Sequence, residues 1–177
     1  MKEKYSLSSS YVSNKPHISY SKKAMLFGQF EGLWDIDIEF FDDDGESVFS
    51  GVGEWCFSWV LDGRILQDVM IFPDLKDPTK TQPGERNIGT SVRQYDAKTD
   101  KWRVVWFGAS SGNFCILNVK EANGDELLLE RNDDNSSYLR WKFSNITADS
   151  FHWTGHYSKD KGETWILEQE MFARRRT

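Results

Sequence analysis

The chain has 177 residues, a net charge of −6 at pH 7 and an isoelectric point near 5.1. An acidic chain without a basic stripe is poorly suited to a phosphate backbone or an anionic membrane, so we expect neither nucleic acid nor a membrane as partner. The length and even composition predict one domain over residues 23–177. Residues 1–22 are polar and serine-rich, without the apolar stretch of a signal peptide. We therefore expect a poorly ordered leader and a cytoplasmic protein.

The predicted elements begin with a short helix and continue as strands. Ser21 is a candidate N-cap for one or two helical turns within 21–28, after which the helical period disappears. Tight-turn dipeptides at Asp44-Gly45, Asp62-Gly63 and Asn123-Gly124 indicate that consecutive strands are antiparallel neighbours. Alternating apolar residues predict strands at 33–41, 46–61, 64–73, 88–95, 101–107, 113–121, 125–131, 137–145, 149–157 and 164–173.

Such a meander predicts an all-β fold. A single open sheet of this size would leave two exposed edges, and closing it removes both. We therefore predict a closed antiparallel up-and-down barrel of about ten strands with a short N-terminal helix. A two-sheet sandwich is the alternative. The long segment from Pro73 to Asn87 interrupts the series of short turns, and it fits a binding loop and a surface insertion equally well.

Tryptophan is the most informative residue type, with eight in the chain. Side chains two positions apart in a strand share a face, so alternating runs place their rings on one side of the sheet. These runs are Trp55, Phe57, Trp59 and Leu61; Trp102, Val104 and Trp106; and Leu139, Trp141 and Phe143. Rings of this size either fill a core or line an apolar cavity, and the residue types do not distinguish the two.

Several polar residues are predicted on the same face as the tryptophans. A two-residue turn at Asp62-Gly63, a Tyr95–Trp102 pair across the next tight hairpin and alternation along the last strand define the register. These rules place on that face Arg64, Asp68, Ser91, Arg93, Tyr95 and Gln169. Buried charges are costly unless paired, so these groups either satisfy one another in a filled core or interact with a ligand.

The segment 158–165 has the pattern Ser-x-Asp-x-Gly-x-Thr-Trp and resembles the Asp-box of sialidases and other sugar-active propellers. Its residues suit a hairpin, because Asp160 and the serine can accept backbone amides and Gly162 can take a positive φ. Trp165 is expected to anchor the turn in the core. A propeller needs several copies whereas this chain has one, so we expect a structural staple distant from the main cavity.

The usual patterns of catalysis and metal binding are absent from the sequence. It has no Gly-x-Ser-x-Gly, no recognisable Cys–His pair and no phosphate-binding glycine loop. On a strand, His152 and His156 would lie about 13 Å apart, too far to share a metal ion. The acidic turn at 42–46 fits a solvated hairpin tip better than a calcium loop. We therefore expect no cofactor and no metal, and we expect Cys56 and Cys115 to be unpaired thiols.

The chain resembles the lipocalin and fatty-acid-binding superfamily, the calycins, at its two ends. A short helix precedes Gly32-x-Trp34 at the start of the first strand, and arginines follow the last strand. The resemblance implies that Trp34 closes one barrel end and that a late arginine, here Arg174 or its neighbour Arg175, packs across it. Residues 25–176 also resemble an uncharacterised bacterial family of calycin-like barrels, a domain of unknown function. The segments that carry this resemblance include Gly-Leu-Trp-Asp-Ile-Asp-Ile and Glu-Gln-Glu-Met-Phe-Ala-Arg-Arg. This implies a fold and no activity.

These observations predict an intracellular binding barrel for a small hydrophobic or amphipathic molecule, such as one bearing a carboxylate. Arg93-Gln94-Tyr95 resembles the Arg-x-Tyr pair with which fatty-acid-binding proteins hold a carboxylate. Two alternatives stay open, a small calycin-type cyclase, isomerase or hydratase with Asp68 as its acid or base, and a filled barrel that acts through its surface. We favour binding over catalysis. The predicted ligand-binding residues are Trp55, Phe57, Trp59, Arg64, Asp68, Arg93, Tyr95, Trp102, Trp106 and Gln169.

Overall fold

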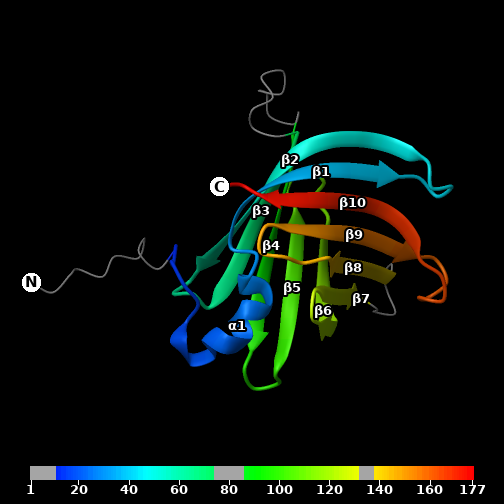
Figure 1. Ribbon diagram of the computed structural model, residues 1–177. Coiled ribbons are helices and arrows are strands. Elements are labelled where there is room, and N and C mark those ends of the chain that lie inside the picture. Colours follow the sequence, from blue (N-terminus) through cyan, green and yellow to red (C-terminus); the bar gives the residue numbers. More distant parts are fainter. Residues whose placement is uncertain (1–10, 74–85, 132–137) are drawn as a thin grey trace, which may run out of the picture.

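The structure, a computed structural model, describes residues 11–73, 86–131 and 138–177. Within these residues, ten strands form one closed antiparallel barrel in which each strand pairs with its sequence neighbours and β10 pairs with β1 (Figure 1). The predicted all-β barrel and the helix within 21–28 are confirmed. The elements are η2 (Ile18–Tyr20), α1 (Ser21–Gly28), β1 (Gly32–Phe41), β2 (Ser47–Val60), β3 (Ile65–Phe72), β4 (Asn87–Asp96), β5 (Lys101–Gly108), β6 (Phe114–Asn123), β7 (Glu126–Arg131), β8 (Tyr138–Ser144), β9 (Ser150–Ser158) and β10 (Ile166–Arg175).

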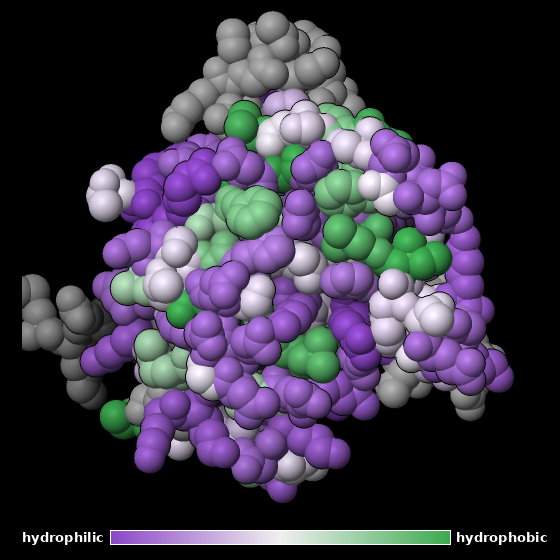
Figure 2. Space-filling view, turned by 45° about the vertical axis from the view of Figure 1, so that its right-hand side comes forward, coloured by the Kyte–Doolittle hydropathy of each residue, from purple (hydrophilic) through white to green (hydrophobic). Residues whose placement is uncertain are grey.

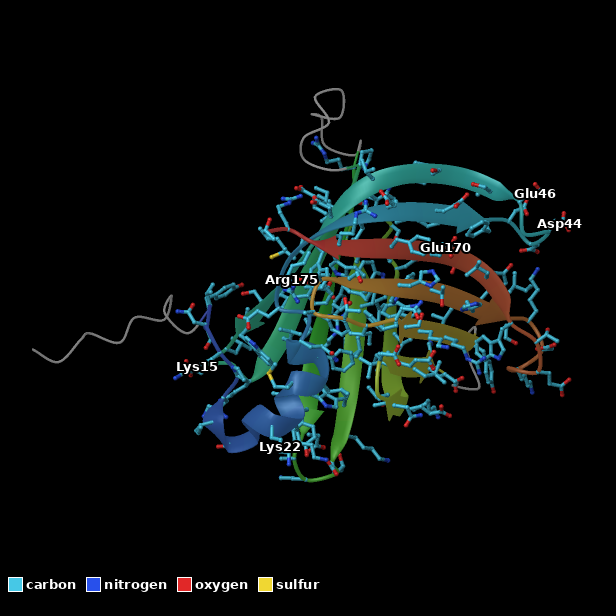
Figure 3. All side chains as sticks on the ribbon, viewed as in Figure 1. Lys15, Lys22, Asp44, Glu46, Glu170 and Arg175 are labelled. Atoms are coloured by element: carbon cyan, nitrogen blue, oxygen red, sulfur yellow. The ribbon has the colours of Figure 1, made fainter. Side chains whose placement is uncertain are left out.

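The two ends of the barrel differ in what lies across them. Helix α1 lies at one end, and the β1–β2 and β9–β10 hairpins extend from the other (Figure 1). Figure 3 shows Lys15 and Lys22 near the helix, whereas Asp44 and Glu46 mark the opposite tip. We name them the helix end, with the turns at 61–64, 97–100 and 124–125, and the open end, with the turns at 42–46, 109–113 and 159–165.

Alternation along the strands separates the interior from the exterior. In β1, Trp34, Ile36 and Ile38 are buried, whereas Asp35 and Asp37 between them bond arginines on the outside. The face seen in Figure 2 is accordingly mostly hydrophilic, with separate hydrophobic groups. The aromatic runs of the sequence therefore point into the barrel.

The strand register agrees with the turn signals. As predicted, Trp55 pairs with Met70 and Phe57 with Asp68 across the β2–β3 hairpin. Tyr95 likewise opposes its predicted partner in β5. The polar residues of β3 and β4 therefore share the interior face with the tryptophans.

Aromatic side chains fill the helix end. Phe27 of α1 contacts Trp102 with ring centroids 5.1 Å apart. Phe30, just after the helix, contacts Phe143 and Phe151 at 4.9 and 5.0 Å. All five rings are buried, and each contributes about 1.5–3 kcal/mol relative to an exposed ring. The helix therefore closes this end of the barrel. A separate finding is that no helix in the described part of the chain is long and apolar enough to cross a membrane.

The predicted contact between Trp34 and a terminal arginine is confirmed. The Arg175 guanidinium lies 4.1 Å from the centre of the Trp34 ring. It also donates hydrogen bonds to the carbonyls of Gln29 at 2.9 Å, Glu31 at 2.5 Å and Ala148 at 2.6 Å. Figure 3 shows Arg175 beside the helix at this end of the barrel. One side chain thus ties the exit of α1 to β1 and to the β8–β9 turn.

Gly32 makes room for this arginine. Its φ is +121°, and a Cβ at this position would lie 2.9 Å from Nη1 of Arg175. The prediction that Arg174 plays this role is wrong, because its exposed side chain points outward and pairs with Asp37 at 2.7 Å. Alternation explains the difference, since Ala173 faces the interior and the next interior position is 175.

Part of the expected leader lies against the barrel. The Ser13 amide donates to the Trp59 carbonyl at 2.8 Å, and the His17 amide donates to the Gly63 carbonyl at 2.9 Å. These two hydrogen bonds place Ser13 and His17 beside the end of β2 and the turn that follows it. Residues 1–10 of that leader, and most of the segment from 73 to 87, lie outside the described residues.

The hairpin at 158–165 is held by its own side chains, as predicted. Asp160 accepts hydrogen bonds from the Thr164 amide at 2.8 Å and the Thr164 hydroxyl at 2.6 Å. The Ser158 hydroxyl accepts the amide of Gly162, which has a φ of +93°. Because these hydrogen bonds stabilise the charged carboxylate, they lower the pKa of Asp160 to about 2.

The expectation that Trp165 anchors this hairpin in the core is wrong. Trp165 is half-buried, and the guanidinium of Arg140 lies 3.9 Å from the centre of its ring. The register of β10 against β9 shifts between Leu167 and Gln169, which reverses the alternation toward the hairpin. The shift leaves Trp165 on the outer surface, where the arginine covers it.

Arg175→Lys should lower the free energy of unfolding by about 1–3 kcal/mol, because lysine cannot stack flat on Trp34 while donating to three carbonyls. Urea unfolding followed by far-UV circular dichroism measures this change. Arg174→Lys is the matched control, and its exposed ion pair should contribute about 0–1 kcal/mol at most. Equal losses in the two variants would contradict the assigned role of Arg175.

The Asp160 carboxyl should titrate near pH 2, below its ordinary value of 3.8. A lowered folded-state pKa adds stability above about pH 4, and this stability is lost as the pH falls through 2. Carbon-detected NMR of the carboxyl group measures the midpoint. Thr164→Val removes one hydrogen-bond donor and should raise the titration midpoint of Asp160. An ordinary midpoint in the unmodified protein would contradict the role of Asp160 in holding this hairpin.

Candidate ligand-binding cavity

A cavity of about 710 Å³ lies inside the open end of the barrel. Every one of the ten strands contributes at least one lining residue, so the cavity is the mouth of the barrel itself and not a groove on its outside. Its size falls within the range of 300–1,000 Å³ that is usual for small-molecule sites. The helix end below it is closed by the aromatic plug.

Four tryptophans form a continuous series around this cavity. Trp106 contacts Trp141 with ring centroids 6.1 Å apart, Trp141 contacts Trp153 at 5.6 Å, and Trp153 contacts Trp55 at 6.4 Å. Each contact is edge-to-face, the arrangement that the charge distribution of aromatic rings favours. Their strands, β2, β5, β8 and β9, are not all neighbours, so the rings meet across the lumen. The resulting wall suits a flat apolar molecule.

Two glycines allow these rings to lie against the barrel wall. A Cβ on Gly89 would lie 2.0 Å from the Trp106 ring, and a Cβ on Gly155 would lie 2.7 Å from the Trp153 ring. A side chain at either position would have to displace an indole. The glycines therefore leave room for the Trp106 ring over the neighbouring strand β4 and for the Trp153 ring over its own strand β9.

The lining also contains polar side chains, and the uncharged ones are Asn87, Ser91, Ser110, Ser111, Asn113 and Gln169. Arg131 and Glu168 are the two charged side chains among the described lining residues. Glu168 is an exposed lining residue beside Gln169, where the strand register shifts, and partial desolvation by the surrounding protein raises the pKa of its carboxyl. Burial also raises the pKa of the lining thiol of Cys115 to about 11, so this thiol is neutral at pH 7 and poorly nucleophilic.

The structure separates the predicted ligand-binding residues by their depth in the barrel. Trp55, Trp106 and Gln169 line the cavity. The other interior residues lie below it, toward the filled helix end, and do not line it: Phe57, Trp59, Asp68, Arg93, Tyr95 and Trp102. Except for Arg64, the common face was therefore predicted correctly, whereas the extent of the cavity along that face was not.

Two of the predicted polar anchors bond elsewhere. The Tyr95 hydroxyl donates to Asp100 at 2.6 Å in the turn between β4 and β5. Arg64 is exposed, with Nη2 3.0 Å from Nε2 of His17. The turn there spans the four residues 61–64 rather than two, so Arg64 precedes β3 and does not reach the interior.

Asp68 and Arg93 form a buried ion pair beneath the cavity. Nη1 of Arg93 bonds the Asp68 carboxylate, and both side chains are at most 1 % exposed. The guanidinium lies between the rings of Phe27 and Phe57, 5.3 and 5.1 Å from their centres, and the Ser91 amide donates to Asp68 at 2.9 Å. This is the internal pair of a filled core. It corrects the prediction of Asp68 as a catalytic acid or base and of Arg93 as a carboxylate anchor.

The histidines of β9 lie outside the cavity. Nε2 of His152 is 3.0 Å from Glu170, and its ring stacks on Phe172 with centroids 4.3 Å apart. Burial and two nearby cations, Arg140 and Lys142, lower the pKa of the other histidine, His156. Within the described chain, no group of histidine, cysteine and carboxylate side chains is arranged to hold a metal ion.

Two lining tryptophans were absent from the predicted site. Trp141 alternates with Leu139 and Phe143, and Trp153 alternates with Phe151. The same period that placed Trp55 and the other predicted tryptophans on the interior face therefore identifies them. The position of these two tryptophans along the barrel axis is determined by the strand register, which the alternation does not give.

Comparison of the chain with protein-family models and with curated proteins found no match. The functional assignment therefore rests on the barrel and on the geometry of its cavity. The features that decide it are the aromatic wall, the ion pair beneath it and the polar groups of the lining.

Asp68→Asn should lower the free energy of unfolding by about 3–5 kcal/mol, because it leaves the Arg93 cation buried without a counterion. Urea unfolding measures this loss. Asp68→Asn/Arg93→Met removes both charges and should be more stable than the single variant. A single variant with unchanged stability would contradict the structural role of this pair.

Proposed function

We propose that this chain is an intracellular binding protein that holds a small, partly apolar molecule in the mouth of a calycin-like barrel. The observation that carries the proposal is the cavity of about 710 Å³, walled by four contacting tryptophans at one end of an otherwise filled barrel. Burying a flat apolar molecule there removes its surface and that of the rings from water, at about 25 cal/mol per Å².

The lining favours binding over the two alternatives. A barrel that acts only through its surface has no use for glycines that hold Trp106 and Trp153 against the wall. An enzyme needs a titratable group near the reacting atoms. Asp68 is bonded to Arg93 below the cavity, and the Cys115 thiol is neutral at pH 7. Among the described lining residues Glu168 is the one carboxyl, and neither a histidine nor a second carboxyl lies in the lining to share acid–base work with it.

The assignment to calycin-like barrels is supported by the two ends of the strand series. The N-terminal helix plugs the barrel, and Trp34 and Arg175 close the same end. The intracellular location is supported by the cysteines, because Cys56 and Cys115 are free thiols and Cys115 faces the interior.

Ligand binding is tested on the purified chain with a panel of small aromatic and aliphatic molecules. Native mass spectrometry first detects any molecule that copurifies. Saturable change of tryptophan fluorescence then measures the affinity of each panel member. We expect Cys115→Phe, which fills the cavity, to weaken binding at least tenfold, or about 1.4 kcal/mol.

Ile116→Phe is the matched control, because this neighbouring residue in β6 faces outward and is 44 % exposed. It should bind as the unmodified chain does. Leu139→Trp provides a second cavity-filling variant from a different strand. A panel without saturable change, or equal losses in the inward and outward variants, would rule out this site.

A further inference from the structure

The outer face of β3–β6 has a region without charged side chains. Two rows of outward residues cross these four strands in register. One row is Val69, Thr90, Phe107 and Phe114, and the other is Gln67, Val92, Val105 and Ile116. The four large apolar side chains that protrude from these rows, Val69, Phe107, Phe114 and Ile116, are between 44 and 64 % exposed. We name these eight residues the uncharged face.

Charged residues are frequent elsewhere on the outside of the barrel. They make up 28 % of the chain. On β1 and β7–β10 they form ion pairs across neighbouring strands, such as Arg174 with Asp37 at 2.7 Å and Arg140 with Glu130 at 2.6 Å. A sheet face in contact with water usually carries polar residues of this kind. The uncharged face therefore has the composition of a surface that another molecule covers.

The uncharged face is large enough to form the centre of a stable interface. The rings of Phe107 and Phe114 stack with centroids 6.4 Å apart, and Ile88, two positions before Thr90, extends the apolar surface along β4. Side chains of this size present roughly 500 Å² of apolar surface together. Each partner in a standard interface buries about 800 Å², and the centre of a homodimer interface is about 65 % apolar. The remaining area can come from the polar residues around the face.

The charge of the chain favours a second copy as the occupant. Because each chain has a net charge of −6, two copies repel each other wherever their charged surfaces meet. Contact through the uncharged face keeps those charges apart. A partner of opposite charge would bind more strongly at the carboxylates elsewhere on the barrel, whereas a face without charge is complementary to itself.

The order of side chains across the face also suits a two-fold axis. The smaller Val69 lies at one margin, on β3, and the larger Phe114 lies at the other, on β6. An axis that runs along the strands between β4 and β5 reverses this order in the second copy. It places Phe114 opposite the partner's Val69 at both margins. Large side chains thus meet small ones, with Val92 and Val105 at the centre.

We propose that this chain forms a two-fold symmetric dimer through the uncharged face, with β4 and β5 at the centre of the interface. The proposal goes beyond the ligand-binding function and does not depend on it. Ile88 and Phe114 also belong to the lining of the cavity, so the interface reaches the rim of its mouth.

Sedimentation equilibrium of the full chain tests the dimer. At micromolar concentration we expect twice the chain mass of 20.6 kDa. Phe107→Arg places a cation from each copy in an apolar interface and should weaken dimer formation at least tenfold. Val69→Arg, on a different strand, should have the same effect and serves as the second test should Phe107→Arg fail to fold.

Phe172→Arg and Val52→Arg are the matched controls. These residues lie on the outside of β10 and β2 and are 48 and 51 % exposed. Both variants should form the dimer as the unmodified chain does. Cross-saturation NMR of dimers made from one labelled and one unlabelled chain locates the interface directly. Saturation should reach the amides of Thr90, Val92 and Val105 and should not reach those of β9.

Several outcomes would overturn the dimer. They are the mass of a single chain at every concentration, an assembly that grows beyond two chains, and equal weakening by the face variants and the controls. A single chain that binds neutral phosphatidylcholine vesicles through Phe107 would instead assign the face to a lipid surface. A dimer with the expected variant effects but without saturable ligand binding would support this inference and overturn the proposed function alone.

Discussion

A closed barrel of ten strands encloses more space than its own inward side chains fill, and the rest of this structure follows from that constraint. Eight strands give an interior that side chains can just fill, and the diameter grows with strand number. At one end, α1 and Phe30 supply the missing volume, and Arg93 adds more because its pairing with Asp68 allows a long charged side chain to be buried. Among the described residues no helix lies at the other end, and there the excess volume remains as the cavity.

The position of the cavity follows from where that filling stops. Above the Asp68–Arg93 pair, the interior residues change from packed rings to rings with open space on one side. The tryptophans satisfy their hydrophobic contacts with one another, whereas two of their N–H groups find no acceptor in the described chain. The accessible lining of the cavity combines these rings with polar side chains such as Ser91 and Asn113.

Sequence patterns predicted the strands, the closed barrel and the interior face, because a period of two and the turn at Asp62-Gly63 determine which side chains share a face. They did not predict how far each inward side chain lies from either end of the barrel. Trp59 and Trp106 have the same periodicity, but one lies under α1 and the other at the cavity. That distinction depends on strand stagger and on which end the helix caps, and neither is encoded locally. The predicted burial of Trp165 failed because the register of β10 shifts, and the predicted inward position of Arg64 failed because the turn before β3 is longer than two residues. Extending the alternation of β10 to its end would have identified Arg175 as the arginine that packs on Trp34.

The glycines beneath the cavity tryptophans are positions at which substitutions can change the shape of the cavity. Gly89 and Gly155 hold no part of the aromatic plug, and the clamp of Trp34 and Arg175 lies at the opposite end of the strands. A larger side chain at either glycine would tilt one indole inward and reshape the space without altering the closure of the barrel. The residues that close the barrel and those that shape the cavity therefore lie in different halves of the same strands, and natural or laboratory evolution can change the second set while conserving the first.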